Sequence, residues 1–213
     1  MLDKIRVVLV NTSHPGNIGG AARAMKNMGL KSLVLVDPIK YPHRDANSRA
    51  AGADDILENA KVVATLEEAL EGCSVVLGTS ARDRRIPWPL LDPREAAGTC
   101  LQMWQADQEA GIALVFGREY AGLTNAELQR CQYHIHIPSD PEFSSLNLAA
   151  AVQVMSYELR LAALDPGAPP AISGAGQVAS HEEVEGLVAH IERAAIGSGF
   201  LDLSISLFGQ HAV

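Results

Sequence analysis

The sequence has few cysteines and no long apolar run, and these absences exclude several classes of protein. Its three cysteines, Cys73, Cys100 and Cys131, are far apart and form no C-x-x-C pair. Neither a disulfide framework nor a zinc site is therefore indicated. No apolar run approaches the ~20 residues that span a membrane, and the N-terminus MLDKIRVVLVNTSH lacks the layout of a signal peptide. We expect a cytoplasmic protein with reduced, structural cysteines.

Positive charge is also scarce. The chain has 17 Lys and Arg against 25 Asp and Glu, a formal net charge of −8, which argues against a generally basic coat for nucleic acid. Residues 1–164 carry 16 cations and 19 anions, whereas residues 165–213 carry one cation and six anions. The near-neutral first part can still bind RNA through a local patch. Arg82, Arg84 and Arg85 form the densest basic cluster, which is either such a patch or a solvated loop.

What the sequence does contain is a regular alternation of strands and helices. Short apolar runs rich in β-branched residues predict strands buried on both faces, and helical segments lie between them. The predicted strands are 5–10, 32–36, 61–65, 74–81, 112–117 and 133–137. The predicted helices are 17–28, 46–53, 66–72, one from 93 into the low 100s, 124–130 and 144–161. This order predicts an α/β fold with a Rossmann-like parallel sheet.

Composition divides the chain into three parts. Residues 1–164 form the predicted α/β domain, and residues 165–179, which begin DPGAPPAISGAG, read as a linker. Residues 180–213 form a predicted helical C-terminal extension, with Ser180 as N-cap and Glu183 at the capping-box position. We expect its apolar stripe to pack on another protein surface, because a lone helix of this length is marginal in water.

The segment 137–161 organises the domain, because it joins a strand end, a polar loop and the longest apolar helix. Ser144 and Ser145 are predicted N-caps, and Leu148 begins an apolar stripe at helical spacing. The residues Ala149, Ala150 and Ala151 keep the helix thin, so that another backbone or a ligand can approach. The alternative is a capped core helix without any ligand.

Three predicted strands end in glycine or small polar residues: GTSA at 78–81, FGRE at 116–119 and IPSD at 137–140. Ligands of open α/β sheets bind outside the carboxyl ends of the strands, so these loops are expected to line one pocket. Gly78 and Gly117 would let the backbone approach the ligand, although glycines also simply punctuate strand ends. No G-x-G-x-x-G fingerprint is present, which disfavours a nicotinamide cofactor.

The segment N-x-G-x-x-x-R at Asn17–Arg23 places an amide at a helix start and an arginine two turns later. Arg23 could grip a phosphate through its planar fork or pair with a carboxylate on the surface. The seven histidines show no spacing typical of metal ligands, so we expect no metal site.

Three segments together resemble, in order and spacing, the motifs of the SPOUT-class RNA 2′-O-ribose methyltransferases. They are the Asn17–Arg23 segment, LVFGREYAGL at Leu114–Leu123 and IPSDPEFSSLNLAAAVQVM at Ile137–Met155. The resemblance covers residues 1 to about 164. The flanking segments look most like the members that methylate cytidine or uridine at position 32 of the tRNA anticodon loop.

The resemblance implies a deep trefoil knot in the C-terminal half of the domain, a homodimer, and S-adenosylmethionine as cofactor. The implied cofactor contacts are Thr79, Ser80, Ala81, Gly117, Ile137, Ser144, Ser145 and Leu146. The implied catalytic residues are Arg23, supplied by the partner subunit, and Asn17, Glu119, Ser145 and Asn147 around it. Arg23, Arg82, Arg84 and Arg85 are the candidates for binding RNA.

The C-terminal extension departs from this resemblance, which implies a basic helical segment. Here GFLDLSISLFGQHAV is apolar and carries no charged side chain except Asp202, so we expect an atypical or truncated extension that adds little to tRNA binding. Three other functions remain open: a nicotinamide- or nucleotide-dependent enzyme, a non-catalytic RNA-binding relative, and a methylase of another tRNA position or of rRNA. The missing glycine fingerprint disfavours the first, and the intact motif residues disfavour the second.

Overall fold

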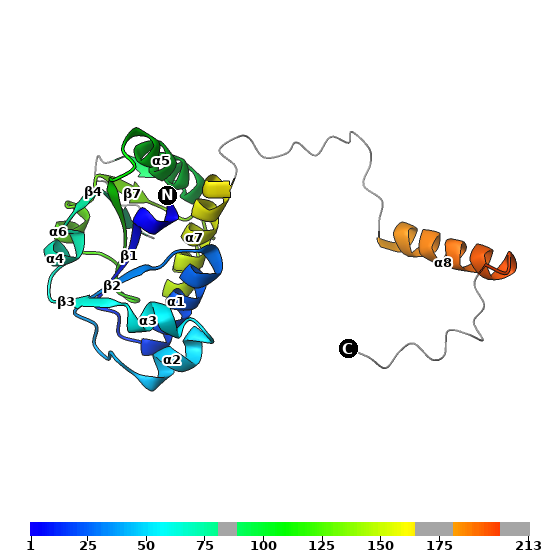
Figure 1. The fold of residues 1–213 in the computed structure, drawn as a ribbon, viewed down its shortest axis with the longest axis horizontal. Coiled ribbons are helices and arrows are strands. Elements are labelled where there is room, and N and C mark those ends of the chain that lie inside the picture. Colours follow the sequence, from blue (N-terminus) through cyan, green and yellow to red (C-terminus); the bar gives the residue numbers. More distant parts are fainter. Residues whose placement is uncertain (81–88, 165–180, 201–213) are drawn as a thin grey trace. The chain divides into compact units, whose positions relative to one another are not determined.

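The computed structural model describes residues 1–80, 89–164 and 181–200. The chain divides into two compact units, Met1–Ala168 and Pro169–Val213. The first is an α/β domain, and the described part of the second contains the helix α8, His181–Gly197 (Figure 1). The predicted linker lies outside the described residues. No helix in the described ranges is long and apolar enough to cross a membrane.

Seven strands of the described chain form one sheet in which every pairing is parallel. They are β1 (Ile5–Val10), β2 (Ser32–Val36), β3 (Lys61–Val63), β4 (Cys73–Thr79), β5 (Leu90–Leu91), β6 (Gly111–Phe116) and β7 (Tyr133–Ile135). Their order in the sheet is β3-β2-β1-β6-β4-β7-β5, which confirms the predicted α/β class. The trefoil knot stays a prediction, since residues 81–88, which follow β4, lie outside the description.

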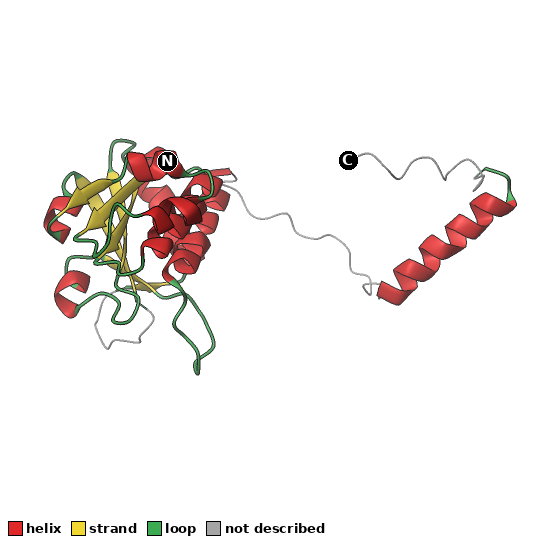
Figure 2. Ribbon diagram, turned by 90° about the horizontal axis from the view of Figure 1, so that it is seen from below, coloured by secondary structure: helices red, strands yellow, loops and turns green. Residues whose placement is uncertain are grey.

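Helices cover both faces of the sheet, because parallel strands need crossover connections (Figure 2). The helices of the domain are α1 (Pro15–Met28), α2 (Arg44–Ala50), α3 (Asp54–Glu58), α4 (Leu66–Leu70), α5 (Pro93–Ala106), α6 (Asn125–Leu128) and α7 (Leu148–Leu164). The helices α1, α2, α3, α5 and α7 share one buried cluster with the sheet, and α4 and α6 share the other. In β1, Val7 faces the first cluster and Val8 the second. This arrangement explains why the strands read as continuous apolar runs.

Helix α1 lies very close to α2 and α7, and glycines make this possible. A Cβ atom on Gly19 would lie 2.0 Å from the carbonyl oxygen of Ala46 in α2. A Cβ atom on Gly20 would lie 2.8 Å from the Cβ of Ala149 in α7. The alanine-rich start of α7 therefore does admit another backbone, as its small side chains predicted.

The start of α7 differs from the prediction. The helix begins at Leu148, and Asn147 is its cap: Asn147 Oδ1 accepts hydrogen bonds from the backbone N–H groups of Ala149 at 2.9 Å and Ala150 at 3.4 Å. Ser144 and Ser145 as N-caps were therefore wrong. Asparagine caps a helix as well as serine does, and the serines instead belong to a loop that continues through Leu146 and Asn147.

Short elements account for the other differences. The predicted strand 133–137 ends at Ile135, and the helix predicted for 46–53 spans Arg44–Ala50. The five residues of α3 and the two of β5 were not predicted, because such short segments carry no readable periodicity. Helix α5 begins at Pro93 as predicted, and Asp92 and Thr124 each complete a capping box at the starts of α5 and α6.

We predict that Gly19→Ala destabilises the domain by about 1–3 kcal/mol, because the new methyl group meets the α2 backbone and must push α1 away. Gly98→Ala in α5 is the matched control, since nothing lies within 4 Å of its added Cβ. It should raise stability by roughly 0.5–1 kcal/mol. Urea unfolding of both variants measures the difference. Equal effects of the two substitutions would contradict the close packing of α1 on α2.

Candidate functional site

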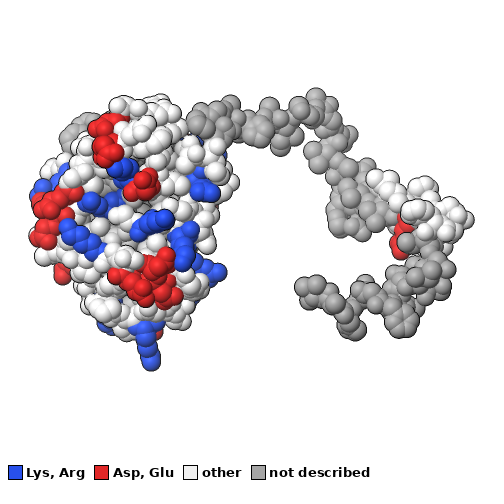
Figure 3. All heavy atoms as spheres, in the orientation of Figure 1, with Lys and Arg blue, Asp and Glu red and all other residues white. Residues whose placement is uncertain are grey.

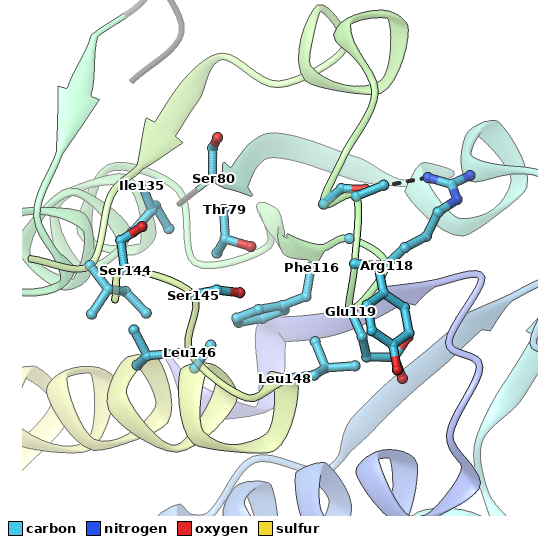
Figure 4. Close-up of a pocket in the computed structure, with 16 residues that line it drawn as sticks. Thr79, Ser80, Phe116, Arg118, Glu119, Ile135, Ser144, Ser145, Leu146 and Leu148 are labelled. Carbon is cyan, nitrogen blue, oxygen red and sulfur yellow. Dashed lines mark hydrogen bonds between the residues drawn. The ribbon is translucent and has the colours of Figure 1, made fainter. Parts of the chain in front are cut away.

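A pocket of about 230 Å³ lies at the carboxyl ends of β4, β6 and β7 (Figure 4). These strands are neighbours in the sheet, with β4 in the middle. The residues that line the pocket are Thr79, Ser80, Phe116, Gly117, Arg118, Glu119, Tyr120, Ala121, Gly122, Ile135, Ile137, Ser144, Ser145, Leu146, Leu148 and Ala151. The three loops that follow predicted strands thus meet at one cavity, as expected from the sequence.

The walls of the pocket combine an apolar surface with hydroxyl groups. Figure 4 shows Phe116, Thr79 and Ser145 around the same space, although they come from three different segments. The end of β4 is fixed to β7 and its following loop, because Ser80 N–H donates to the carbonyl of Ile135 at 2.9 Å and the Ser80 carbonyl lies 3.3 Å from His136 Nδ1. The sheet therefore fixes the backbone that carries the side chains of these two walls.

Gly117 allows the loop after β6 to fold back on itself. Arg118 and Gly122 exchange two backbone hydrogen bonds of 3.2 and 2.9 Å, and a Cβ on Gly117 would lie 2.2 Å from the backbone of Gly122. Gly78, in contrast, does not line the pocket. A Cβ there would lie 2.7 Å from Cys131 Sγ, so the expectation that Gly78 lets a ligand approach is wrong: this glycine makes room for the core.

The carboxylate of Glu119 lies at the pocket and receives hydrogen bonds from the loop between β1 and α1. Ser13 donates through its N–H and its hydroxyl, both at 3.1 Å, and His14 donates through its N–H at 3.1 Å. Asn17 Nδ2 donates at 3.0 Å. Burial raises the pKa of Glu119, but the bonds from Asn17, Ser13 and His14 outweigh burial and leave the pKa below its ordinary value. Glu119 is therefore a fixed anion and a weak proton acceptor.

Asn17 extends this network to the third motif. Its Oδ1 accepts a hydrogen bond from Asn147 Nδ2 at 2.9 Å, while Asn147 Oδ1 caps α7. One continuous path of side chains, from Glu119 through Asn17 to Asn147, thus connects the β6 loop, the start of α1 and the start of α7. The three motifs that are distant in sequence lie together in the structure.

A second network holds the β6 loop from its other side. Arg118 Nη1 and Nη2 donate to the two carboxylate oxygens of Glu127, both at 3.0 Å, and Nη2 also donates to Asn11 Oδ1. Asn11 Nδ2 in turn donates to Asp37 Oδ2 at 2.9 Å. Burial raises the pKa of Glu127, and the bonds from Arg118 and Thr124 lower it overall. Sequence reasoning did not find Arg118, although it directly precedes Glu119 in the FGRE segment.

The structure brings most, but not all, of the predicted site residues together. Thr79, Ser80, Gly117, Ile137, Ser144, Ser145, Leu146 and Glu119 line the pocket. Asn147 lines an adjoining groove. Arg23 is exposed on α1 and has no ion pair in the described part of the chain. Ala81, Arg82, Arg84 and Arg85 lie outside the described residues.

Several pocket residues were missed by the sequence analysis. Phe116 and Leu148 line the cavity as apolar neighbours of motif residues, and Tyr120 adds an exposed ring. The available signal was position, because these residues lie inside the motif segments Leu114–Leu123 and Ile137–Met155. Their apolar character instead suggested the core.

Cysteine and metal chemistry find no support around this pocket. Burial raises the pKa of Cys100 and Cys131 to about 12, so neither thiol is a ready nucleophile. Among the described residues, no group of three His, Cys, Asp or Glu is placed to hold a metal ion. His134 Nε2 lies 3.2 Å from the carbonyl of Leu128 and is committed to the backbone.

We predict that Glu119→Gln destabilises the protein by about 1–3 kcal/mol at neutral pH, because the new amide group would face donors in the β1–α1 loop. The folded pKa of Glu119 is lowered from 4.5. The stability that the Glu119 carboxylate contributes is therefore complete at pH values above 4.5. It is lost as the pH falls through the lower pKa that Glu119 has in the folded protein. Urea unfolding at a series of pH values should show the two proteins converging in acid.

Glu58→Gln, at an exposed position of α3, is the control and should change stability by less than about 0.5 kcal/mol. A difference between wild type and Glu119→Gln that stays constant from neutral to acid pH would show that the carboxylate charge does not stabilise the loop.

Comparison with known proteins identifies the family. Residues 4–157 match the SpoU rRNA Methylase family. A Pseudomonas aeruginosa protein named tRNA (cytidine/uridine/adenosine-2′-O-)-methyltransferase TrmJ is 66% identical over 210 residues, covering 95% of this chain and 81% of its own length. A solved probable methylase family protein from Haemophilus influenzae is 43% identical with a TM-score of 0.73, covering 95% of this chain and 83% of that one.

A more distant structure shows the shared fold alone. The SpoU methyltransferase AviRb from Streptomyces viridochromogenes, solved in complex with its cofactor AdoMet, is 24% identical with a TM-score of 0.59. The alignment covers 74% of this chain and 60% of that one. The parallel sheet, the pocket at its strand ends and the three motifs agree with these likenesses, and the chain belongs to the SpoU rRNA methylase family, a family of methyltransferases.

Proposed function

We propose that this protein transfers a methyl group from S-adenosylmethionine to the ribose 2′-hydroxyl of cytidine or uridine at position 32 of the tRNA anticodon loop. The observation that carries the proposal is the joining of three motifs at one pocket through the path from Glu119 to Asn17 and Asn147. The name of the 66% identical relative supports tRNA as the substrate and cytidine and uridine as targets, and it adds adenosine as a third base to test.

The residues of the pocket fit S-adenosylmethionine. Phe116, Ile135, Ile137, Leu146 and Leu148 offer an apolar surface for a purine ring, and Thr79 and Ser80 offer polar groups beside it. The bound cofactor supplies a methyl carbon on a positively charged sulfur, which the ribose oxygen attacks in line. Glu119, as a nearby anion, favours a cationic ligand over a neutral one. The proposed contacts are Thr79, Ser80, Gly117, Ile137, Ser144, Ser145 and Leu146, with Ala81 outside the described residues.

The chain's own residues contribute mainly by positioning. Asn17 and Asn147 hold the β1–α1 loop and the start of α7 at a fixed separation, and Ser145 lies between the pocket and the adjoining groove. In such a displacement, correct placement of nucleophile and methyl carbon provides much of the rate. The carboxylate oxygens of Glu119 already accept four hydrogen bonds, so the hydroxyl proton is proposed to leave to solvent.

Arg23 is proposed to act on the RNA bound to a partner subunit in a homodimer. Its side chain is exposed and carries a positive charge that no described acidic group of its own chain neutralises. The planar guanidinium keeps its proton and suits bidentate binding of a phosphate. Arg23 would thus fix the phosphate beside the reacting ribose and polarise its hydroxyl.

Electrostatic attraction of tRNA is proposed to come from a local patch. On the face shown in Figure 3, basic and acidic side chains are interspersed over the domain, and no extended basic surface appears there. Arg82, Arg84 and Arg85 therefore remain the proposed source of salt-dependent binding, although they lie outside the described residues.

The activity is tested with purified protein, labelled S-adenosylmethionine and tRNA carrying cytidine, uridine or adenosine at position 32. We expect methyl transfer to cytidine and uridine, mapped to position 32 by nuclease digestion and mass spectrometry. The same tRNA with a 2′-deoxynucleotide at position 32 is the control, because it lacks the nucleophile. Methylation of that control would assign another target, and S-adenosylhomocysteine binding without transfer to any RNA would favour the non-catalytic alternative.

We predict that Arg23→Ala lowers methyl transfer by about 100-fold or more, as expected when a positioning contact with the substrate is lost. Binding of S-adenosylhomocysteine, measured by calorimetry, should stay within a few-fold of wild type. Arg23→Lys keeps the charge but not the planar fork, so it should recover only part of the activity. Loss of cofactor affinity or of folding in Arg23→Ala would show that the residue is structural.

A mixed dimer tests whether the site is shared between subunits. Arg23→Ala and Ser145→Ala protomers are expected to be inactive alone and to regain activity when combined, because one complete composite site is rebuilt. Verified heterodimers without activity would contradict supply of Arg23 by the partner.

A further inference from the structure

A groove of about 740 Å³ adjoins the pocket. The two cavities share Ile137, Ser145 and Leu146. The other side of the groove is made by the start of α5, with Asp92 and Arg94, and by α7, with Glu158. A ligand in the pocket and a second group in the groove would therefore meet along the Ser145–Leu146 backbone.

Phe143 lines this groove and is 84% exposed. Its loop is closed at the base, where Ser139 Oγ donates to the carbonyl of Ser144 at 3.0 Å. Asp140 tightens the tip, because its carboxylate accepts from the N–H of Glu142 at 2.8 Å and its carbonyl accepts from the N–H of Phe143 at 3.0 Å. The ring is thus displayed on an ordered turn, so little backbone entropy remains to be lost on binding.

The charges around the groove do not suit a phosphate. Arg94 is paired with Glu158, with Nε at 3.2 Å from a carboxylate oxygen, and this ion pair neutralises the cation that lines the groove. Asp140 and Glu142 beside Phe143 are exposed acids. A flat, uncharged group fits this combination better than an anion does. Bases of single-stranded RNA are such groups, and aromatic side chains stack on them.

We propose that this groove receives the base of the nucleotide being methylated, stacked on Phe143, while its ribose faces the pocket at Ser145. The inference rests on the proposed RNA methylation. A base is bonded directly to its ribose, so a groove that adjoins the pocket is the place that the base of the reacting nucleotide would occupy. Anticodon-loop nucleotides are unpaired and can turn their bases outward.

The proposal predicts that Phe143→Ala lowers kcat/KM for tRNA methylation by about 5- to 100-fold, the range for loss of one base stack. Phe143→Trp should retain most of the activity, and Phe143→Leu, which keeps an apolar side chain without an aromatic face, should resemble the alanine variant. Binding of S-adenosylhomocysteine should be unchanged in all three variants.

The decisive experiment combines these variants with tRNA that is abasic at the target position but keeps its ribose. The abasic tRNA should lower kcat/KM of the wild type by the same factor by which Phe143→Ala lowers kcat/KM on normal tRNA. For Phe143→Ala, kcat/KM should be the same on the abasic and the normal tRNA. A full additional loss in the variant would overturn the proposal. So would reduced S-adenosylhomocysteine affinity or dissociation of the oligomer in sedimentation, which would assign Phe143 to the cofactor loop or to a contact between copies. Failure of the wild type to methylate any tRNA would instead refute the proposed function itself.

Discussion

The geometry of the site depends on one partly buried carboxylate. Glu119 accepts three hydrogen bonds from the loop between β1 and α1 and a fourth from the side chain of Asn17 at the start of α1. A carboxylate removed from water is stable only when its oxygens accept hydrogen bonds. The β6 loop, which carries Glu119, and the β1–α1 loop, which donates to it, therefore keep each other in position. Asn147 then joins the start of α7 to the same network. Three segments from different parts of the chain are in this way held at one pocket without any metal ligand taking part.

The β6 loop is held from both sides, because adjacent residues point in different directions. Glu119 contacts the β1–α1 loop, and Arg118 contacts Glu127 and Asn11. Asn11 and Asp37 both have a left-handed backbone, with φ of 46° and 42°, which costs about 1–2 kcal/mol for residues other than glycine. The hydrogen bonds from Asn11 Nδ2 to the carbonyl and carboxylate of Asp37 offset part of this strain. Both residues tolerate this conformation better than most, which explains why the chain uses Asn and Asp at the ends of β1 and β2.

The fold was largely predictable from the sequence, because buried parallel strands such as β1 and β6 appear as uninterrupted apolar runs and helices such as α5 begin at recognisable caps. The meeting of strand ends at one pocket followed from the rule for open α/β sheets. What could not be predicted depends on contacts between distant residues. The roles of Asn147 as both cap and partner of Asn17, of Gly78 as a core position, and of Arg118 as an anchor of the loop are set by tertiary neighbours that no local pattern specifies. The predicted knot would likewise be a property of how the chain is threaded, which no periodicity specifies.

The proposed base contact and the proposed chemistry are consistent with each other in one further respect. Methylation of a 2′-hydroxyl acts on a group that every ribonucleotide carries, so the chemistry itself does not distinguish bases. Stacking on Phe143 would not distinguish them strongly either, because every base has an aromatic face. The polar side chains that line the groove mostly bond within the protein: Arg94 pairs with Glu158, Ser139 Oγ donates to the carbonyl of Ser144, and Asn147 bonds to Asn17 and to the start of α7. A site of this kind would select its nucleotide mainly by the shape of the loop that presents it.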